Sequence, residues 1–195
     1  MIRFFDLLFS VVALILLFPF LLLIALIILL DSSGNIFFFQ SRVGKGNRDF
    51  MMLKFRTMYN GSEEKGSLTV GNDDQRITRT GHFLRKYKLD ELPQLINIVK
   101  GEMSLVGPRP EVRKYVAFYN ETQRNVLSLR PGLTDYASLE YLHENELLGN
   151  SPDPEKTYIE EIMPAKLELN KKYLQDPGLK NYFRIIGKTI IRIFR

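Results

Sequence analysis

The sequence contains no cysteine, which excludes a disulfide framework, a thiolate metal site and a cysteine nucleophile. Histidine is scarce as well: His82 and His143 are the only two, which is too few for a histidine-rich metal cage. Neither has an evident partner cluster, and a lone histidine is more often structural than catalytic. Any metal ion bound by this chain is therefore expected to be a hard cation held by oxygen atoms.

Acidic residues are missing from the last part of the chain. Residues 179–195 contain no Asp or Glu, although the whole protein has a formal charge of only +5. The cations in this stretch are Lys180, Arg184, Lys188, Arg192 and Arg195. Most of them recur every four residues beside apolar positions, which predicts an amphipathic helix. Two interpretations stand equally: a helix in the lipid headgroup layer, and a core-packing helix with a solvated basic edge. Nucleic-acid binding is not expected, because no basic sheet with interleaved aromatic residues is predicted.

Charge is also absent from residues 7–30, which are almost wholly apolar. A run of about 24 such residues can cross a hydrocarbon core of about 30 Å as one helix. Pro19 removes a backbone donor inside this run, so a bend is expected at Phe18-Pro19. Each arm would then be roughly 16–23 Å long, which is too short to span a bilayer alone.

Basic residues on both sides of the apolar run indicate its orientation. Arg3 precedes the run, and several cations from Arg42 to Arg56 follow it, so the positive-inside tendency places both ends on the cytoplasmic side. We therefore expect a re-entrant membrane hairpin over residues 1–34 and a cytoplasmic domain over residues 35–195. A single helix that crosses the membrane with a kink at Pro19, and a cleaved signal peptide, are the weaker alternatives.

The remaining sequence predicts an α+β fold that is predominantly helical. Apolar segments at 36–40 and 50–55, joined by a glycine-containing turn at 43–47, indicate a small β-hairpin. The polar segment 60–74 is typical of a loop. Helices are expected at 81–87, 91–100, 114–127, 164–174 and 179–195. The expected architecture is a proline-broken re-entrant helix, the hairpin, and a compact cytoplasmic helical domain with interfacial amphipathic helices.

Two adjacent acids, Asp90 and Glu91, lie at the predicted start of the 91–100 helix. Asp90 is a favourable N-cap, Pro93 is tolerated in a first helical turn, and Gly101 is a favourable terminator. A helix start offers free N–H groups and a partial positive charge, so a carboxylate, a hard cation and a phosphate can converge there. Such a pair taken alone is usually only a helix cap.

Several cations surround this acidic pair in the sequence. Arg85 lies five residues before Asp90, and Arg109 is held between two prolines in a stiff segment. An arginine fixed in this way offers planar, bidentate donors that suit a diphosphate. Each cation alone is more often part of a surface salt bridge, so their joint presence carries the prediction of a phosphate site. The candidate phosphate- and donor-binding residues are Lys54, Arg56, Arg85, Arg109 and Arg130.

Most of the chain resembles one known family, the monotopic phosphoglycosyl transferases or bacterial sugar transferases, which start O-antigen, capsule, exopolysaccharide and glycoprotein glycan assembly. The resemblance is carried by a specific order of motifs. They are the proline-broken anchor and residues 40–44, 54–58, 74–79, 89–94, 101–110, 119–123 and 130–134.

The resemblance implies a two-step reaction on a UDP-sugar. Asp90 would attack the sugar-bearing phosphate, which would give an aspartyl-phosphosugar and release UMP, and polyprenyl (undecaprenyl) phosphate would then attack that intermediate. The resemblance also implies Mg²⁺ as cofactor, with Asp90 and Glu91 as its ligands, and Glu91 as either a metal-assisting or a proton-transfer group. Arg56, Arg85 and Arg109 match the phosphate-binding cations of the family.

The resemblance further implies a monotopic enzyme on the cytoplasmic face of the bacterial inner membrane. Its partners would be the UDP-sugar donor, the polyprenyl phosphate acceptor and membrane lipids, and a homodimer is compatible with the sequence. A non-enzymatic, membrane-anchored binding module is the alternative function. The sequence departs from the family in two places, since Phe18-Pro19 replaces a frequent Ser-Pro bend and Thr134-Asp135 replaces a frequent Thr-Gly.

Overall fold

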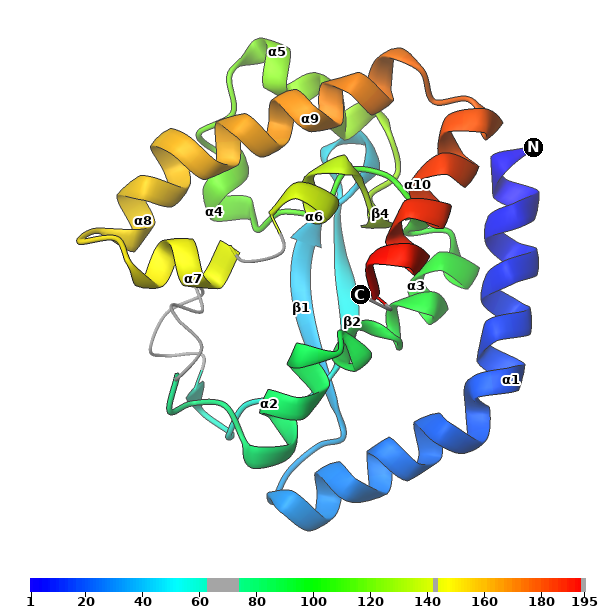
Figure 1. Cartoon of the computed structure of the whole chain (residues 1–195), viewed down its shortest axis with the longest axis vertical. Helices are drawn as coiled ribbons and strands as arrows, with labels where there is room; N and C mark the ends of the chain where they lie inside the picture. The colour runs from blue at the N-terminus through cyan, green and yellow to red at the C-terminus, as the bar shows by residue number, and fades with distance from the viewer. Residues whose placement is uncertain (63–73, 142–143, 194–195) are drawn as a thin grey trace.

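The structure is a computed structural model that describes residues 1–62, 74–141 and 144–193. The described part is mostly helical, as the sequence predicts, and contains two small two-stranded sheets (Figure 1). Most of the expected 60–74 loop, His143, Phe194 and Arg195 lie outside the described residues.

The first helix, α1 (Ile2–Asp31), contains Pro19 and is drawn as two arms that meet at an angle (Figure 1). It is long and apolar enough to cross a membrane by length and composition. Near its start, Arg3 donates hydrogen bonds to the carbonyls of Ile98 and Val99, at 2.5 and 2.9 Å. At its end, the Asp31 carboxylate accepts a bond from the Thr80 amide at 3.0 Å. Both ends of α1 are therefore attached to the folded part of the chain that follows.

The predicted hairpin is confirmed, with longer strands than expected. Strand β1 (Phe37–Val43) pairs antiparallel with β2 (Asp49–Phe55), so that Phe37 is opposite Phe55 and Val43 is opposite Asp49. A short 3-10 turn at Lys45–Asn47 joins them, and Gly46 takes a left-handed conformation with φ of 67°. The glycine-containing segment thus forms the turn, as its composition predicts.

The region around the acidic pair differs from the expected single helix over 91–100. Helix α2 (Arg79–Lys86) is followed by a one-turn 3-10 segment, η3 (Leu89–Glu91), and α3 begins only at Gln94 (Gln94–Lys100). The proline explains the difference, because Pro93 has no N–H to bond the carbonyl of Leu89, which instead accepts from the Leu92 amide at 3.3 Å. Asp90 therefore lies inside a 3-10 turn and does not cap α3.

A second sheet was not predicted. Strand β3 (Ser104–Val106) pairs parallel with β4 (Gly132–Thr134). The two backbones approach closely next to this sheet, because a Cβ atom on Gly107 would lie 2.3 Å from the carbonyl oxygen of Arg130. Strands of three residues are too short to show an alternating pattern, so the sequence gives little sign of them.

The expected helix over 114–127 is wrong, since the structure divides it. Helix α4 (Arg113–Val116), α5 (Glu121–Arg124) and the 3-10 segment η4 (Asn125–Ser128) take its place. Asn120 starts a new helix at α5, because its side chain and that of Gln123 form a reciprocal capping box.

The C-terminal third consists of helices around the same core. They are α6 (Tyr136–Glu140), α7 (Glu144–Gly149), α8 (Pro154–Thr157), a π-helical turn η5 (Tyr158–Ile162), α9 (Met163–Gln175) and α10 (Leu179–Ile193). The expected helices at 164–174 and 179–195 correspond to α9 and, over its described residues, to α10.

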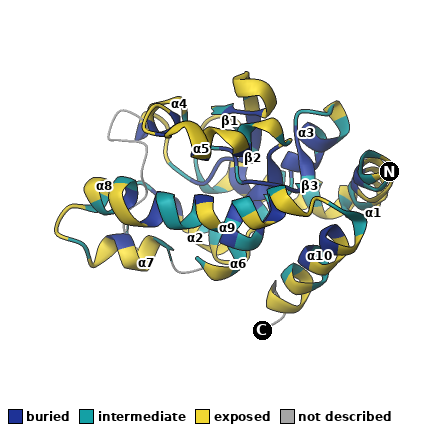
Figure 2. Cartoon of the chain, turned by 90° about the horizontal axis from the view of Figure 1, so that it is seen from above, coloured by how far each residue is buried: buried dark blue, intermediate teal, exposed yellow. Residues whose placement is uncertain are grey.

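Helix α10 combines features of both interpretations of its sequence. Tyr182 and Ile185 are fully buried and pack in a cluster with Val106 and Tyr173. Toward the C-terminus the helix extends away from the other elements and its surface is exposed (Figure 2). Ile190 and Ile191 are more than half exposed there. The first half of α10 is thus a core helix, whereas its second half presents an apolar and basic surface.

Candidate active site

A cavity of about 1990 Å³ brings most of the predicted site residues together. Its wall includes residues of the β1–β2 hairpin, the η3 turn, the segment after β3, and helices α6, α9 and α10. The charged residues that line it include Lys54, Arg85, Asp90, Glu91 and Arg109. The acidic pair and three of the five predicted cations therefore face one space.

A left-handed residue, Lys88, lies between α2 and the turn that carries the acidic pair. Lys88 follows the end of α2 and has a left-handed conformation, with φ of 56° and ψ of 21°. A lysine in this conformation costs on the order of 1 kcal/mol. The η3 turn that follows buries both acids, and Asp90 and Glu91 are 7% and 8% exposed. The sequence did not reveal this turn, because neither glycine nor asparagine marks it.

Glu91 is bound by two cations. Arg109 donates hydrogen bonds to its carboxylate from both guanidinium Nη atoms. One bond reaches Oε2 at 3.2 Å, and the other is a closer contact with Oε1. The Lys54 Nζ atom donates to Oε1 at 3.1 Å. Burial alone would raise the pKa of Glu91, but Arg109 and Lys54 outweigh it and hold this pKa well below its usual value. Glu91 is therefore a fixed anion that holds two cations at the cavity wall.

Asp90 differs from Glu91 in its partners. Its Oδ1 atom is buried and has no hydrogen-bond partner among the described residues. Burial raises the pKa of Asp90, and the charge of Glu91 raises it further, while Lys54 and Arg85 act in the opposite direction. Because a buried carboxylate oxygen without a partner is costly, this atom is suited to bind a cation or to react.

The segment that carries Arg109 is held on both sides. The Arg109 amide donates to Asp135 Oδ2 at 3.2 Å, and Arg42 Nη1 donates to the carbonyl of Pro110 at 3.1 Å. Asp135 is fully buried and also caps α6 through the Ser138 amide at 2.6 Å. The departure at Asp135 from the family pattern thus has a structural role. Sequence reasoning missed both Arg42 and Asp135 as supports of the site.

Arg85 reaches the cavity from α2. Its Nε atom donates to the Thr57 hydroxyl at 2.8 Å, which fixes the guanidinium next to the segment after β2. Burial lowers the pKa of Arg85, and the charges of Asp90 and Asp74 oppose this effect. The geometry is compatible with the predicted phosphate contact.

The other two predicted cations lie elsewhere. Arg56 follows the end of β2 and donates to the carbonyls of Ser32, at 2.6 Å, and Ser33, so it closes the C-terminal end of α1. Arg130 is exposed, and its Nε atom donates to the carbonyl of Gly101 at 3.0 Å. The alternation of side chains along β2 ends at Phe55, so Arg56 does not continue the face on which Lys54 lies.

The predicted metal site can be tested against the donor atoms. Within residues 1–62, 74–141 and 144–193, no group of three or more His, Asp or Glu side chains comes together as a metal cage. Magnesium is commonly held by only one or two carboxylates together with substrate phosphates and water. The partnerless Oδ1 of Asp90 fits such a site, whereas both oxygens of Glu91 are already bound by Arg109 and Lys54.

The cavity also contains regions that sequence reasoning did not anticipate. On one side, Lys166 pairs with Glu144 at 2.7 Å, and Asn170 on α9 contributes a buried amide. On another side, apolar residues such as Phe183 and Ile190 of α10 contribute to the wall. A polar region and an apolar region therefore adjoin the charged centre.

The model of the family described as bacterial sugar transferase matches residues 1–195. A UDP-N-acetylgalactosamine-undecaprenyl-phosphate N-acetylgalactosaminephosphotransferase from Aeromonas hydrophila is 38% identical over 190 residues, which are 95% of this chain and 41% of that protein.

Two further relatives are a second undecaprenyl-phosphate transferase and an exopolysaccharide production protein. A UDP-glucose:undecaprenyl-phosphate glucose-1-phosphate transferase from Xanthomonas campestris pv. campestris is 33% identical over 192 residues, or 96% of this chain and 37% of that protein. The exopolysaccharide production protein ExoY from Sinorhizobium fredii is 42% identical over 147 residues, or 68% of this chain and 65% of that protein. The chain spans about two fifths of the length of the first two relatives.

Proposed function

Because this chain belongs to the bacterial sugar transferase family, we propose that it transfers a sugar 1-phosphate from a UDP-sugar to a polyprenyl phosphate such as undecaprenyl phosphate. Two relatives are named for transfers of this kind, and their names give different sugars. The proposal therefore specifies a UDP-sugar as a class. The observation that carries it is the contrast between Glu91, which is bound by two cations, and the adjacent Asp90, whose Oδ1 has no hydrogen-bond partner within the described part of the chain.

Asp90 is the nucleophile in this proposal. A carboxylate oxygen of Asp90 forms a bond to the phosphorus that carries the sugar, and the bond from that phosphorus to the bridging oxygen of the diphosphate breaks. UMP leaves with the bridging oxygen and its electron pair, and an aspartyl-phosphosugar remains. The raised pKa of Asp90 supports this role, because a more basic carboxylate is a stronger nucleophile once it is ionised.

In the second step, an oxygen of polyprenyl phosphate forms a bond to the same phosphorus. The bond between phosphorus and Asp90 breaks, which regenerates the carboxylate and yields a polyprenyl diphosphosugar. In the first step the anionic donor approaches the negative Asp90, and in the second the anionic acceptor approaches the negatively charged phosphosugar on Asp90. The cations at the cavity wall are therefore needed to lower this repulsion. Arg109 and Lys54 are held in place by Glu91, and Arg85 is held by Thr57.

Asp90 would hold Mg²⁺ together with the diphosphate of the donor, and the ion would neutralise phosphate charge. Glu91 would act mainly by holding Arg109 and Lys54, because its oxygens are already engaged by these cations. This arrangement favours a supporting role for Glu91 over direct metal ligation.

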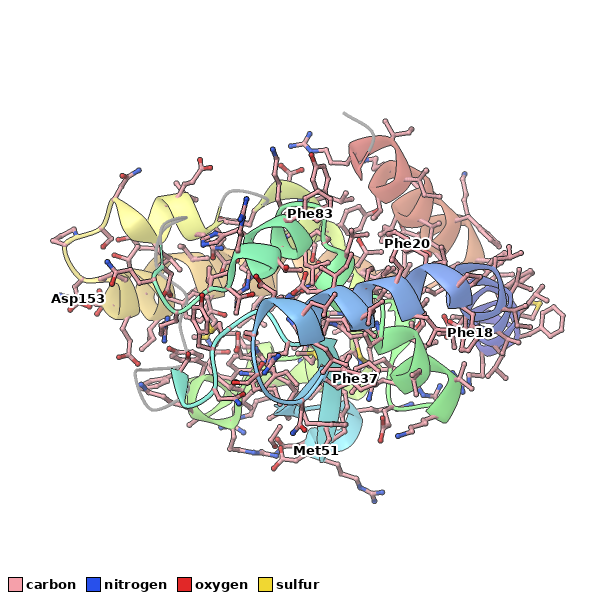
Figure 3. All side chains as sticks on the ribbon, turned by 90° about the horizontal axis from the view of Figure 1, so that it is seen from below. Phe18, Phe20, Phe37, Met51, Phe83 and Asp153 are labelled. Atoms are coloured by element: carbon pink, nitrogen blue, oxygen red, sulfur yellow. The ribbon has the colours of Figure 1, made fainter. Side chains whose placement is uncertain are left out.

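We also propose that the protein lies on one face of the bacterial inner membrane, with the cavity on the cytoplasmic side. A straight helix of 30 residues would be about 45 Å long and would separate its ends across the bilayer. Instead, Arg3 and Asp31 at the two ends of α1 both bond to the same domain. Exposed aromatic side chains such as Phe18 and Phe20 on α1, and Phe83 on α2, provide an apolar surface for lipid (Figure 3).

The test is mass spectrometry of the purified protein after incubation with candidate UDP-sugars and Mg²⁺. The expected result is UMP release with a sugar-phosphate adduct on the peptide that contains Asp90. Asp90→Asn should abolish both, whereas Glu91→Gln should retain a weaker adduct. Donor binding without UMP release in the wild-type protein would instead support the binding-module alternative, and an adduct on another residue would refute Asp90 as the nucleophile.

A further inference from the structure

A buried aspartate connects the apolar anchor to the rest of the molecule. Asp6 lies on the first arm of α1, outside the residues that line the cavity, and is 1% exposed. Both of its oxygens accept from the Ser104 hydroxyl at 2.9 Å, and Oδ1 also accepts from the Leu105 amide at 2.9 Å. The Tyr182 hydroxyl of α10 donates to Oδ1 at 2.9 Å. Three elements, α1, β3 and α10, therefore meet at one carboxylate.

The chemistry of these contacts calls for an acceptor without a hydrogen atom. The Leu105 amide can only donate, and a carboxylate can accept from it and from both hydroxyls at the same time. An aspartate among neutral donors is expensive to bury, so packing of an apolar helix alone does not explain its presence in α1. The cost of burying the Asp6 carboxylate indicates that the position of the elements it bonds matters for the site.

What Asp6 fixes is the strand that leads to Arg109. Only Val106, Gly107 and Pro108 separate Leu105 from Arg109. This segment is bonded to β4 and to the residue before it, since the Ser104 amide donates to the Pro131 carbonyl at 2.8 Å and the Gly107 amide donates to the Thr134 carbonyl of β4 at 3.1 Å. A displacement of β3 at Asp6 would therefore move the Arg109 backbone.

We propose that Asp6 is a positioning residue that aligns Arg109 with Glu91 through β3. This inference rests on the proposed function, because Arg109 matters only if the cavity binds phosphate. Docking of the first arm of α1 then sets the geometry of a cation in the active site. The anchor thus contributes to the reaction as well as to membrane attachment.

The experiment measures steady-state UMP release by the full chain in nanodiscs, with donor concentration varied. Asp6→Ala should lower kcat/KM for the UDP-sugar by on the order of 10- to 100-fold, because an angstrom-scale displacement of a phosphate-binding group has effects of this size. Ser104→Ala should lower it in the same direction by a smaller factor. The matched control is Tyr182→Phe, which removes the α10 bond but leaves the bonds from Ser104 and Leu105 of β3, and it should stay within about twofold of wild type. An equal loss in Tyr182→Phe and Asp6→Ala would overturn the proposal.

A double-mutant cycle separates positioning from general stability. In an Arg109→Lys background, Asp6→Ala should cost no more than about twofold, because the group that it aligns is already altered. Fully multiplicative losses would overturn the proposal, as would a lower melting temperature with unchanged kcat/KM per folded molecule. If Asp6→Ala does not fold, the same cycle with Ser104→Ala decides the question. A wild-type protein that releases no UMP would overturn the proposed function itself, which distinguishes the two failures.

Discussion

Arg109→Gln tests how the site stabilises its two adjacent acids. In the wild-type protein, Arg109 contacts both oxygens of Glu91, and the Glu91 and Arg109 side chains are 11% and 35% exposed. Glutamine at this position removes the charge and the bidentate contact. Glu91 would then remain buried, and of its two cationic partners only Lys54 would be left.

The expected loss of stability follows from these exposures. Removing one partner of a buried ion pair costs about 3–5 kcal/mol. The solvent contact of Arg109 and the remaining bond from Lys54 reduce this cost, so we expect about 1–3 kcal/mol at neutral pH. For a protein of this size, this corresponds to a decrease of roughly 2–12 °C in melting temperature.

The difference between variant and wild type should depend on pH. The folded-state pKa of Glu91 is held below the usual value of 4.5, so its ionised form stabilises the fold above that pH. This contribution is lost as the pH falls through the folded-state pKa. In Arg109→Gln the pKa of Glu91 is lowered less, so the contribution is smaller. The stability difference should therefore be fully present at pH 7 and shrink below about pH 4.5.

Thermal unfolding in detergent micelles between pH 2.5 and pH 7.5 would measure this difference, and kcat/KM for the donor would be measured near neutral pH. Arg113→Gln is the matched control, because it breaks an ion pair with Asp49 whose side chains are 48% and 49% exposed. That pair is expected to contribute at most about 1 kcal/mol. Equal destabilisation by the two substitutions, or a difference that does not change with pH, would refute the reasoning.

Three further substitutions test other parts of the structure. Arg56→Gln should lower the melting temperature, because the carbonyl groups at the end of α1 lose the arginine that bonds them. The KM for the UDP-sugar should stay within about twofold of wild type. A large increase in this KM would show that Arg56 binds phosphate. Lys88→Val should lower the free energy of unfolding by about 1–3 kcal/mol, because a β-branched residue is strained in the left-handed conformation of this position. Lys88→Gly should be tolerated, because glycine adopts this conformation freely. Equal stabilities of the valine and glycine variants would argue against strain at Lys88. Gly107→Ala should reduce both the melting temperature and the rate of UMP release, because the alanine Cβ would lie 2.3 Å from the carbonyl oxygen of Arg130. An unchanged rate of UMP release would show that the backbone can relax to accept the methyl group.

The sequence was most informative where one motif carried several constraints. Asp90, Glu91 and Arg109 lie close together in the chain, and the structure places them at one cavity. The hairpin was also predictable, since its strands are apolar and its turn contains glycine. In these cases local chemistry and tertiary structure agree.

The missed features depend on contacts between distant segments. Lys88 is left-handed although its residue type gives no sign of it, and Asp135 supports Arg109 from a separate strand-helix junction. Arg56 was predicted at the phosphate site from the 54–58 motif and the family resemblance, and in the structure its side chain bonds to the end of α1. Tertiary hydrogen bonds of this kind follow from the three-dimensional path of the chain and not from a local pattern.

The attachment of α1 at both ends has a mechanical consequence. Helix α1 is hydrogen-bonded to the rest of the fold at Arg3 and again at Asp31, so neither of its ends is loose. Pulling on the N-terminus would load the Arg3 and Asp6 bonds before it could extract the bend, so the anchor should not peel away while the domain stays folded. In single-molecule extraction from a bilayer, the anchor and the β3 region should yield in one event. The strength of attachment to lipid would then be limited by the fold and not by the apolar length of the helix.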